Sequence, residues 1–143
     1  MTLSAARLAR RGLRASIPFL ALVLLAACGP GNAVDVKYNG YTLLPSHATM
    51  KAGDIVFNIN NQNGQVLHQF LVVQTDVPAG QLPLGAEAKV DESSLKIVGQ
   101  LAKIDVGQSA TLNAHLAPGH YVLMCNIVGH YQLGMHADFA VTP

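Results

Sequence analysis

His120-Tyr-Val-Leu-Met-Cys125 is followed by Asn126-Ile-Val-Gly-His-Tyr-Gln-Leu-Gly-Met135 and then by His136-Ala-Asp-Phe-Ala-Val141. The first and third runs are apolar at every second position, which is the period of a β-strand with one buried face. Cys125 falls on the inward face of the first run, and Met135 is in phase with the inward face of the last. The run between them contains two glycines, which suit a tight loop. This part of the chain therefore predicts two strands joined by a loop.

Other segments of the chain have the same character, with β-branched and aromatic residues separated by Gly, Pro, Asn and Asp. The region Pro78–Gly99 is less regular, and within it residues 91–97 predict one or two helical turns with Asp91 as the N-cap. We interpret this region as a crossover between two sheets. Seven to eight short strands in roughly 110 residues favour an all-β sandwich of one domain. The predicted strands are Val34–Tyr38, Tyr41–Leu44, Asp54–Asn60, Val66–Val73, Ser109–Leu116, His120–Cys125 and His136–Val141.

The predicted loop contains three candidate metal ligands: Cys125, His130 and Met135, each separated from the next by four residues. A glycine directly precedes both His130 and Met135, and Gly129 would allow the chain to turn the imidazole back towards Cys125. A thiolate, imidazole nitrogens and a weak thioether form the ligand set of a blue-copper electron-transfer centre. Each residue also has a simpler interpretation, as a buried thiol, a solvated histidine or a core methionine.

A blue-copper centre needs a second histidine, and His68 is the best candidate. It lies within the predicted strand Val66–Val73, on the same face as Phe70 and Val72. We expect His115 and His120 to be solvated because they flank a turn, and His136 to point away from Met135 because side chains alternate along a strand. The histidines that compete with His68 are His47, His115, His120 and His136.

The N-terminus predicts export. Four arginines are followed by an apolar stretch from Ile17 to Ala27 and then by Cys28, the order of a secretory signal. About a dozen apolar residues are too few for a membrane span, which needs roughly 20. Leu25-Ala-Ala-Cys28 resembles the lipobox of bacterial lipoproteins, where the signal is removed and the cysteine is acylated. We therefore expect a signal peptide at 1–27, a lipid-anchored tether at 28–33 and a folded domain at 34–143.

Charge and cysteine content limit the partners of this domain. After residue 27 the chain has five lysines, no arginine and eight acidic residues, so its net charge is about −3. No basic stripe suits a nucleic acid. The chain has two cysteines. With Cys28 at the processing site, Cys125 has no disulfide partner, and metal ligation accounts for a lone thiol outside the cytoplasm.

Cys125-x4-His130-x4-Met135 with an upstream His68 resembles the cupredoxins, particularly their rusticyanin, auracyanin and sulfocyanin side. The resemblance covers residues 34–143 and implies a Greek-key β-sandwich that holds one copper ion through His68, Cys125, His130 and Met135. Azurin-like members carry Asn after the first histidine, whereas this chain has Gln69. That neighbour ties the ligand loops together and tunes the metal, so the difference concerns the reduction potential rather than ligation.

The resemblance implies a monomeric carrier of one electron, cycling between Cu(I) and Cu(II), and not an enzyme. The edge of His130 would reach the surface, where Val128, Tyr131 and Leu133 could form an apolar patch for transient redox partners. The location would be the periplasmic or cell-surface face of a bacterial membrane. The main alternative is a Cu(I) storage or delivery protein, since Cys, His and Met also suit Cu(I). Copper enzymes of this type resemble tandem domains with His-x-His pairs, and the sequence contains no such pair.

Overall fold

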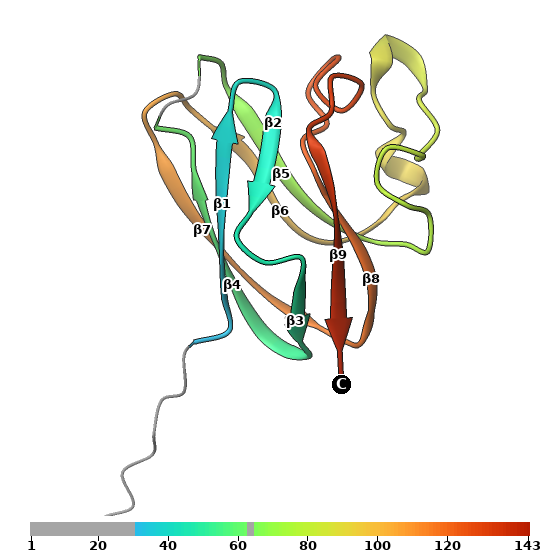
Figure 1. Cartoon of the computed structure of the whole chain (residues 1–143). Coiled ribbons are helices and arrows are strands. Elements are labelled where there is room, and N and C mark those ends of the chain that lie inside the picture. The colour runs from blue at the N-terminus through green and yellow to red at the C-terminus, as the bar shows by residue number, and fades with distance from the viewer. Residues whose placement is uncertain (1–30, 63–64) are drawn as a thin grey trace, which may run out of the picture.

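Two β-sheets face each other in the computed structural model, which describes residues 31–62 and 65–143 (Figure 1). The first sheet has the strand order β2-β1-β4-β7, and the second has the order β3-β9-β8-β5-β6. Strand β1 is parallel to β4 and β3 is parallel to β9, whereas the other pairs are antiparallel. The strands are β1 (Ala33–Asn39), β2 (Thr42–Pro45), β3 (Thr49–Lys51), β4 (Gly53–Asn60), β5 (His68–Gln74), β6 (Lys96–Ile104), β7 (Ser109–Leu116), β8 (Gly119–Met124) and β9 (His136–Thr142).

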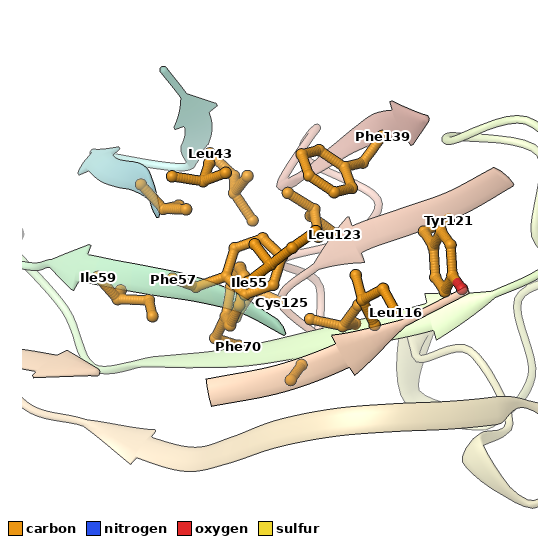
Figure 2. Packing of buried hydrophobic residues seen from close by; sticks show 14 of the residues in the cluster. Leu43, Ile55, Phe57, Ile59, Phe70, Leu116, Tyr121, Leu123, Cys125 and Phe139 are labelled. Atoms are coloured by element: carbon orange, nitrogen blue, oxygen red, sulfur yellow. The ribbon is translucent and has the colours of Figure 1, made fainter. Parts of the chain in front are cut away.

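The core between the sheets is formed by the alternating apolar residues of the strands. In β4, Ile55, Phe57 and Ile59 are fully buried, while Asn58 between them is exposed. Phe57 packs against Phe70 of β5 and Phe139 of β9, with ring centroids 5.4 and 5.5 Å apart. Figure 2 shows these rings in the same cluster as Cys125. The ligand loop is thus joined to the main core of the sandwich.

Strands β5 and β8 are apolar on both faces because a second cluster covers the outer face of their sheet. Leu71 of β5 and Val122 of β8 point away from the main core. They pack there against Leu82 and Val90, which belong to the segment between β5 and β6. A strand buried on both faces loses the alternating pattern and appears in sequence as a continuous apolar run.

The all-β sandwich is confirmed, and all seven predicted strands are present with ends that differ by at most two residues. The prediction missed β3, which has three residues, and β6, which lies at the edge of its sheet and has few buried side chains. The interpretation of Pro78–Gly99 as a crossover between sheets is wrong. Strands β5 and β6 are neighbours in one sheet, so the segment between them leaves that sheet and returns to it.

The helical part of this segment consists of two 3-10 turns, η1 (Ala86–Ala88) and η2 (Glu92–Ser94). Asp91 caps η2 as predicted, since its side chain accepts a hydrogen bond from the backbone N–H of Ser93 at 3.0 Å. The turn is shorter than expected because β6 begins at Lys96. Within the described ranges, no helix has the length and apolar character needed to cross a membrane. The predicted signal peptide at 1–27 and Cys28 lie outside the described residues.

Candidate metal centre

The four candidate ligands come from the same end of three adjacent strands. His68 is the first residue of β5, Cys125 directly follows β8, and Met135 directly precedes β9. Because β8 runs antiparallel to both β5 and β9, the start of β5, the end of β8 and the start of β9 meet. His130 lies in the loop that joins β8 to β9, at the upper end of the sandwich in Figure 1. The topology therefore gathers residues that are far apart in sequence.

Three of these side chains form a compact group of donor atoms. One ring nitrogen of His68, one of His130 and the sulfur of Cys125 all lie within 4.8 Å of one another. Cys125 Sγ is 3.4 Å from His130 Nδ1. Met135 is fully buried in the same core cluster as Cys125, and its backbone carbonyl accepts a hydrogen bond from the Cys125 N–H at 3.0 Å. The structure thus groups the donor atoms of His68, Cys125 and His130, and it places Met135 in the same buried cluster as Cys125.

The loop from Cys125 to Met135 is wound tightly by its own backbone. The N–H of His130 donates to Ile127 O at 2.8 Å, and the N–H of Met135 donates to His130 O at 3.1 Å. Gly129 has φ = +77° and Gly134 has φ = +103°. Residues other than glycine rarely adopt these positive φ values. The turn predicted at Gly129 is therefore present, and it points His130 back towards Cys125.

His68 has the environment of a residue that lacks a partner. Its side chain is fully buried, and neither Nδ1 nor Nε2 makes a hydrogen bond to another described residue. Burial, and secondarily the neighbouring His130, lower the pKa of His68 to about 4, so its imidazole is neutral at pH 7. A neutral buried imidazole with a free nitrogen is the form that binds a metal. The residues present therefore fit a soft-metal site.

The sulfur of Cys125 is held by the residue next to His68. The backbone N–H of Gln69 donates to Cys125 Sγ at 3.3 Å. Burial raises the pKa of the Cys125 thiol, with hydrogen bonds from the backbone of Gln69 and Ile127 acting in the opposite direction. The protein alone therefore favours the neutral thiol, whereas a bound cation would favour the thiolate.

Gln69 also connects the two ligand-bearing segments through its side chain. Its Oε1 accepts a hydrogen bond from the backbone N–H of Asn126 at 3.3 Å. Gln69 therefore links the start of β5 to the segment that follows β8. The Gln69 carbonyl accepts a hydrogen bond from the hydroxyl of Tyr38 at 2.9 Å. The ring of Tyr38 lies against His68, with centroids 4.5 Å apart. Sequence reasoning missed the role of Tyr38, since in the sequence it appears only as the last residue of the predicted strand Val34–Tyr38.

The four competing histidines lie elsewhere or point away. His115 is exposed and pairs with Asp54 at 2.7 Å, and His47 contacts the hydroxyl of Ser46 at 2.9 Å. His136 packs on Tyr131 rather than towards Cys125. The expectation of a solvated His120 is wrong, because its ring contacts the carbonyl of Thr75 and the carboxylate of Asp138. Thr75 follows β5 and Asp138 lies in β9, so the local turn signal could not reveal these contacts.

The surface around His130 differs from the expected patch at one position. Val128 and Leu133 are 56% and 60% exposed. Tyr131, however, is only 3% exposed, because its hydroxyl accepts a hydrogen bond from the Leu82 N–H at 3.0 Å and its ring faces the second cluster. Tyr41, in the turn between β1 and β2, occupies the place next to the imidazole instead. No local pattern in the sequence relates Tyr41 to a loop almost ninety residues away.

Comparisons with known proteins agree with this geometry. The model of the sulfocyanin (SoxE) domain family matches residues 16–143. A search of curated protein sequences gives no match. Among solved structures, dithionite-reduced auracyanin from the photosynthetic bacterium Roseiflexus castenholzii is 21% identical with a TM-score of 0.59, over 80% of this chain and 100% of that one.

Two further structures have the same fold at similar identity. Auracyanin A, a "blue" copper protein from Chloroflexus aurantiacus, is 19% identical with a TM-score of 0.55, over 77% of this chain and 98% of that one. Rusticyanin is 19% identical with a TM-score of 0.52, over 77% of this chain and 76% of that one. At these identities the similarity establishes the sandwich architecture.

Proposed function

Because the chain belongs to the sulfocyanin (SoxE) domain family, we propose that it is a blue-copper protein that carries one electron between redox partners. His68, Cys125, His130 and Met135 are the proposed ligands of a single copper ion. The observation that carries the proposal is the buried imidazole of His68, which has no hydrogen-bond partner within residues 31–62 and 65–143 and lies beside the sulfur of Cys125 and the imidazole of His130. A soft thiolate with two imidazoles and a thioether is the donor set that such a site uses.

Bound copper would supply the one-electron Cu(I)/Cu(II) couple, and the role of the protein is to hold its donors still. His68 and Cys125 are fixed by paired strands, and the Gln69 N–H restrains the sulfur. The backbone hydrogen bonds of the loop restrain His130 and Met135. Donors held in this way move little when the charge at the centre changes, which keeps the reorganisation associated with electron transfer small.

The electron is proposed to pass through the loop end of the sandwich. Val128 and Leu133 are exposed apolar residues on either side of His130, and the exposed ring of Tyr41 contacts its imidazole. We name Tyr41, Val128 and Leu133 the docking patch. A small apolar patch suits the brief encounters of redox proteins, which bury less area than stable complexes. The protein would act as a monomer and as a carrier rather than an enzyme.

The N-terminal sequence supports a location outside the cytoplasm. We propose that residues 1–27 are removed as a signal peptide and that Cys28 is acylated, so that residues 28–33 tether the 34–143 domain to a membrane. Mass spectrometry of the membrane fraction tests this: the mature chain should begin at a lipid-modified Cys28. A Cys28→Ser variant should lose the lipid, and recovery of an unmodified mature chain from the wild type would contradict the proposal.

The spectrum of the copper-loaded full chain tests the proposed function. We expect an intense visible thiolate-to-copper band that disappears on reduction and returns on oxidation. The Cys125→Ser variant should lose this band, whereas Cys28→Ser, which changes the other cysteine, should keep it. A chain that binds Cu(I) but shows no reversible band would instead support storage or delivery of Cu(I).

A further inference from the structure

Residues 82–92, which we name the brace, lie beside the ligand loop of residues 125–135. Figure 1 shows the brace in yellow next to the orange-red loop. The brace is anchored by Leu82 and Val90, whose buried side chains pack in the second cluster with Leu71 and Val122. Because the brace belongs to the β5–β6 connection, it reaches the loop from outside the three strands that bear the ligands.

Asn126, the residue directly after Cys125, joins the loop to the brace. Its side chain is fully buried, and its Oδ1 accepts a hydrogen bond from the Val90 N–H at 2.8 Å. Its Nδ2 donates to the Val90 carbonyl at 2.8 Å and to Glu92 Oε1 at 2.9 Å. One amide thus pairs with both backbone groups of Val90. A buried amide whose oxygen and nitrogen are both hydrogen-bonded fixes the orientation of the residue that carries it.

The brace contacts the loop at two further points. The N–H of Leu82 donates to the hydroxyl of Tyr131 at 3.0 Å, and the N–H of Gly129 donates to the Ala88 carbonyl at 3.4 Å. These contacts lie on either side of His130 in sequence, while Asn126 adjoins Cys125. The brace therefore restrains the loop next to two of the proposed ligands.

From this arrangement we propose that Asn126 is a positioning residue through which the brace fixes the ligand loop and slows the loss of bound metal. The inference rests on the proposed copper function. Removal of the amide would leave the N–H and carbonyl of Val90 buried without partners, which is costly. The loop could then relax away from the brace and move Cys125 relative to His68. Residues that orient metal ligands typically change metal affinity by about 10–100-fold when mutated.

The rate of copper transfer from the loaded full chain to excess chelator tests the inference. Asn126→Ala should release copper about 10–100-fold faster than the wild type. Its thiolate-to-copper band should also shift or weaken, because the geometry at Cys125 changes. Leu116→Ala is the control: Leu116 is a buried residue at the end of β7, paired with Gly53 at the start of β4, and it does not belong to the second cluster that anchors the brace. It should destabilise the fold but leave the release rate and the band unchanged.

A milder pair of variants covers the case in which Asn126→Ala does not fold. Glu92→Ala removes only the bond at the partly buried end of the amide and should accelerate copper release severalfold. Glu92→Gln keeps an acceptor oxygen for Asn126 and should release copper at close to the wild-type rate. Equal release rates for wild type, Glu92→Ala and Glu92→Gln would overturn the inference.

A metal-free measurement separates this inference from the proposed function. Amide hydrogen exchange in the copper-free full chain should accelerate at Gly129 and Val90 in Asn126→Ala and not in Leu116→Ala. If the copper-loaded wild type shows no thiolate-to-copper band, the proposed function is wrong, whatever the rates of amide hydrogen exchange. If the wild type forms a blue site but Asn126→Ala leaves both the exchange and the copper release unchanged, the positioning role fails alone.

Discussion

Tyr41 lies edge-on against His130, with ring centroids 5.1 Å apart and ring planes 86° apart. Tyr41 is 43% exposed, whereas His130 is only 7% exposed although it lies in a loop. The tyrosine therefore separates the imidazole from solvent. His130 is the most exposed of the four proposed ligands, and the ring that covers it comes from the turn between β1 and β2, two strands of the opposite sheet.

His130→Ala should leave a folded, copper-binding chain with an opened site. His68, Cys125 and Met135 remain buried at the ends of β5, β8 and β9, so we expect copper to bind with a weaker or displaced visible band and slower electron self-exchange. Added imidazole should partly restore the band by entering the vacated position. His115→Ala, at an exposed histidine outside the site, is the control. A His130→Ala protein with the wild-type band and self-exchange rate would refute the ligand assignment.

Leu133→Asp should slow electron self-exchange at least about tenfold, because two copies that meet through the docking patch then oppose like charges. The reduction potential and the visible band should change little, since the side chain is 60% exposed. Raising the ionic strength should recover part of the rate. The control Val77→Asp places the same charge on another exposed apolar residue. Val77 follows the end of β5 that is opposite to His68. If both variants slow self-exchange equally, the docking patch is not the contact surface.

Met135→Leu should raise the reduction potential while keeping the visible band. A thioether that donates weakly to copper would favour the oxidised ion, whereas leucine fills a similar volume without donating. The stability cost should stay below about 1.5 kcal/mol because the change conserves volume. Met50→Leu, at a partly buried methionine in β3, should leave the potential unchanged. Redox titration of both variants measures the difference, and a lowered or unchanged potential in Met135→Leu would contradict ligation by Met135.

The copper-free chain should lose stability as the pH falls from 7 to 5. His68 has a folded pKa of about 4 against an ordinary value of 6.5, so the unfolded chain binds the proton first. Stability is therefore full above pH 6.5 and declines towards pH 4, with a loss of about 2 kcal/mol between pH 7 and 5 from this residue. Burial lowers the pKa of His130 as well, which acts in the same direction.

Urea unfolding of the copper-free chain at the two pH values measures this effect. A His68→Leu variant should show a smaller loss, since leucine does not titrate. The outcome that speaks against a buried neutral imidazole is equal pH dependence in the wild type and in His68→Leu.

Periodicity predicted the strands that have one buried face. Phe57 in β4 and Phe139 in β9 are both buried at the alternate positions that the pattern indicates. Strand β6 was missed because a strand at the edge of a sheet buries few side chains and carries a weak pattern. The return of the 75–95 segment to its own sheet was also missed, because which strands are neighbours depends on pairing between distant segments.

The sequence by itself determined the identity and order of the candidate ligands, because Cys125, His130 and Met135 are close in the chain and a thiolate, an imidazole and a thioether together form a donor set that suits copper. Only the tertiary structure decided what surrounds them. Tyr41 contacts His130, and Asn126 contacts Val90, across separations of 89 and 36 residues. Contacts of this kind arise from the way strands pair and loops pack, and no local period encodes them.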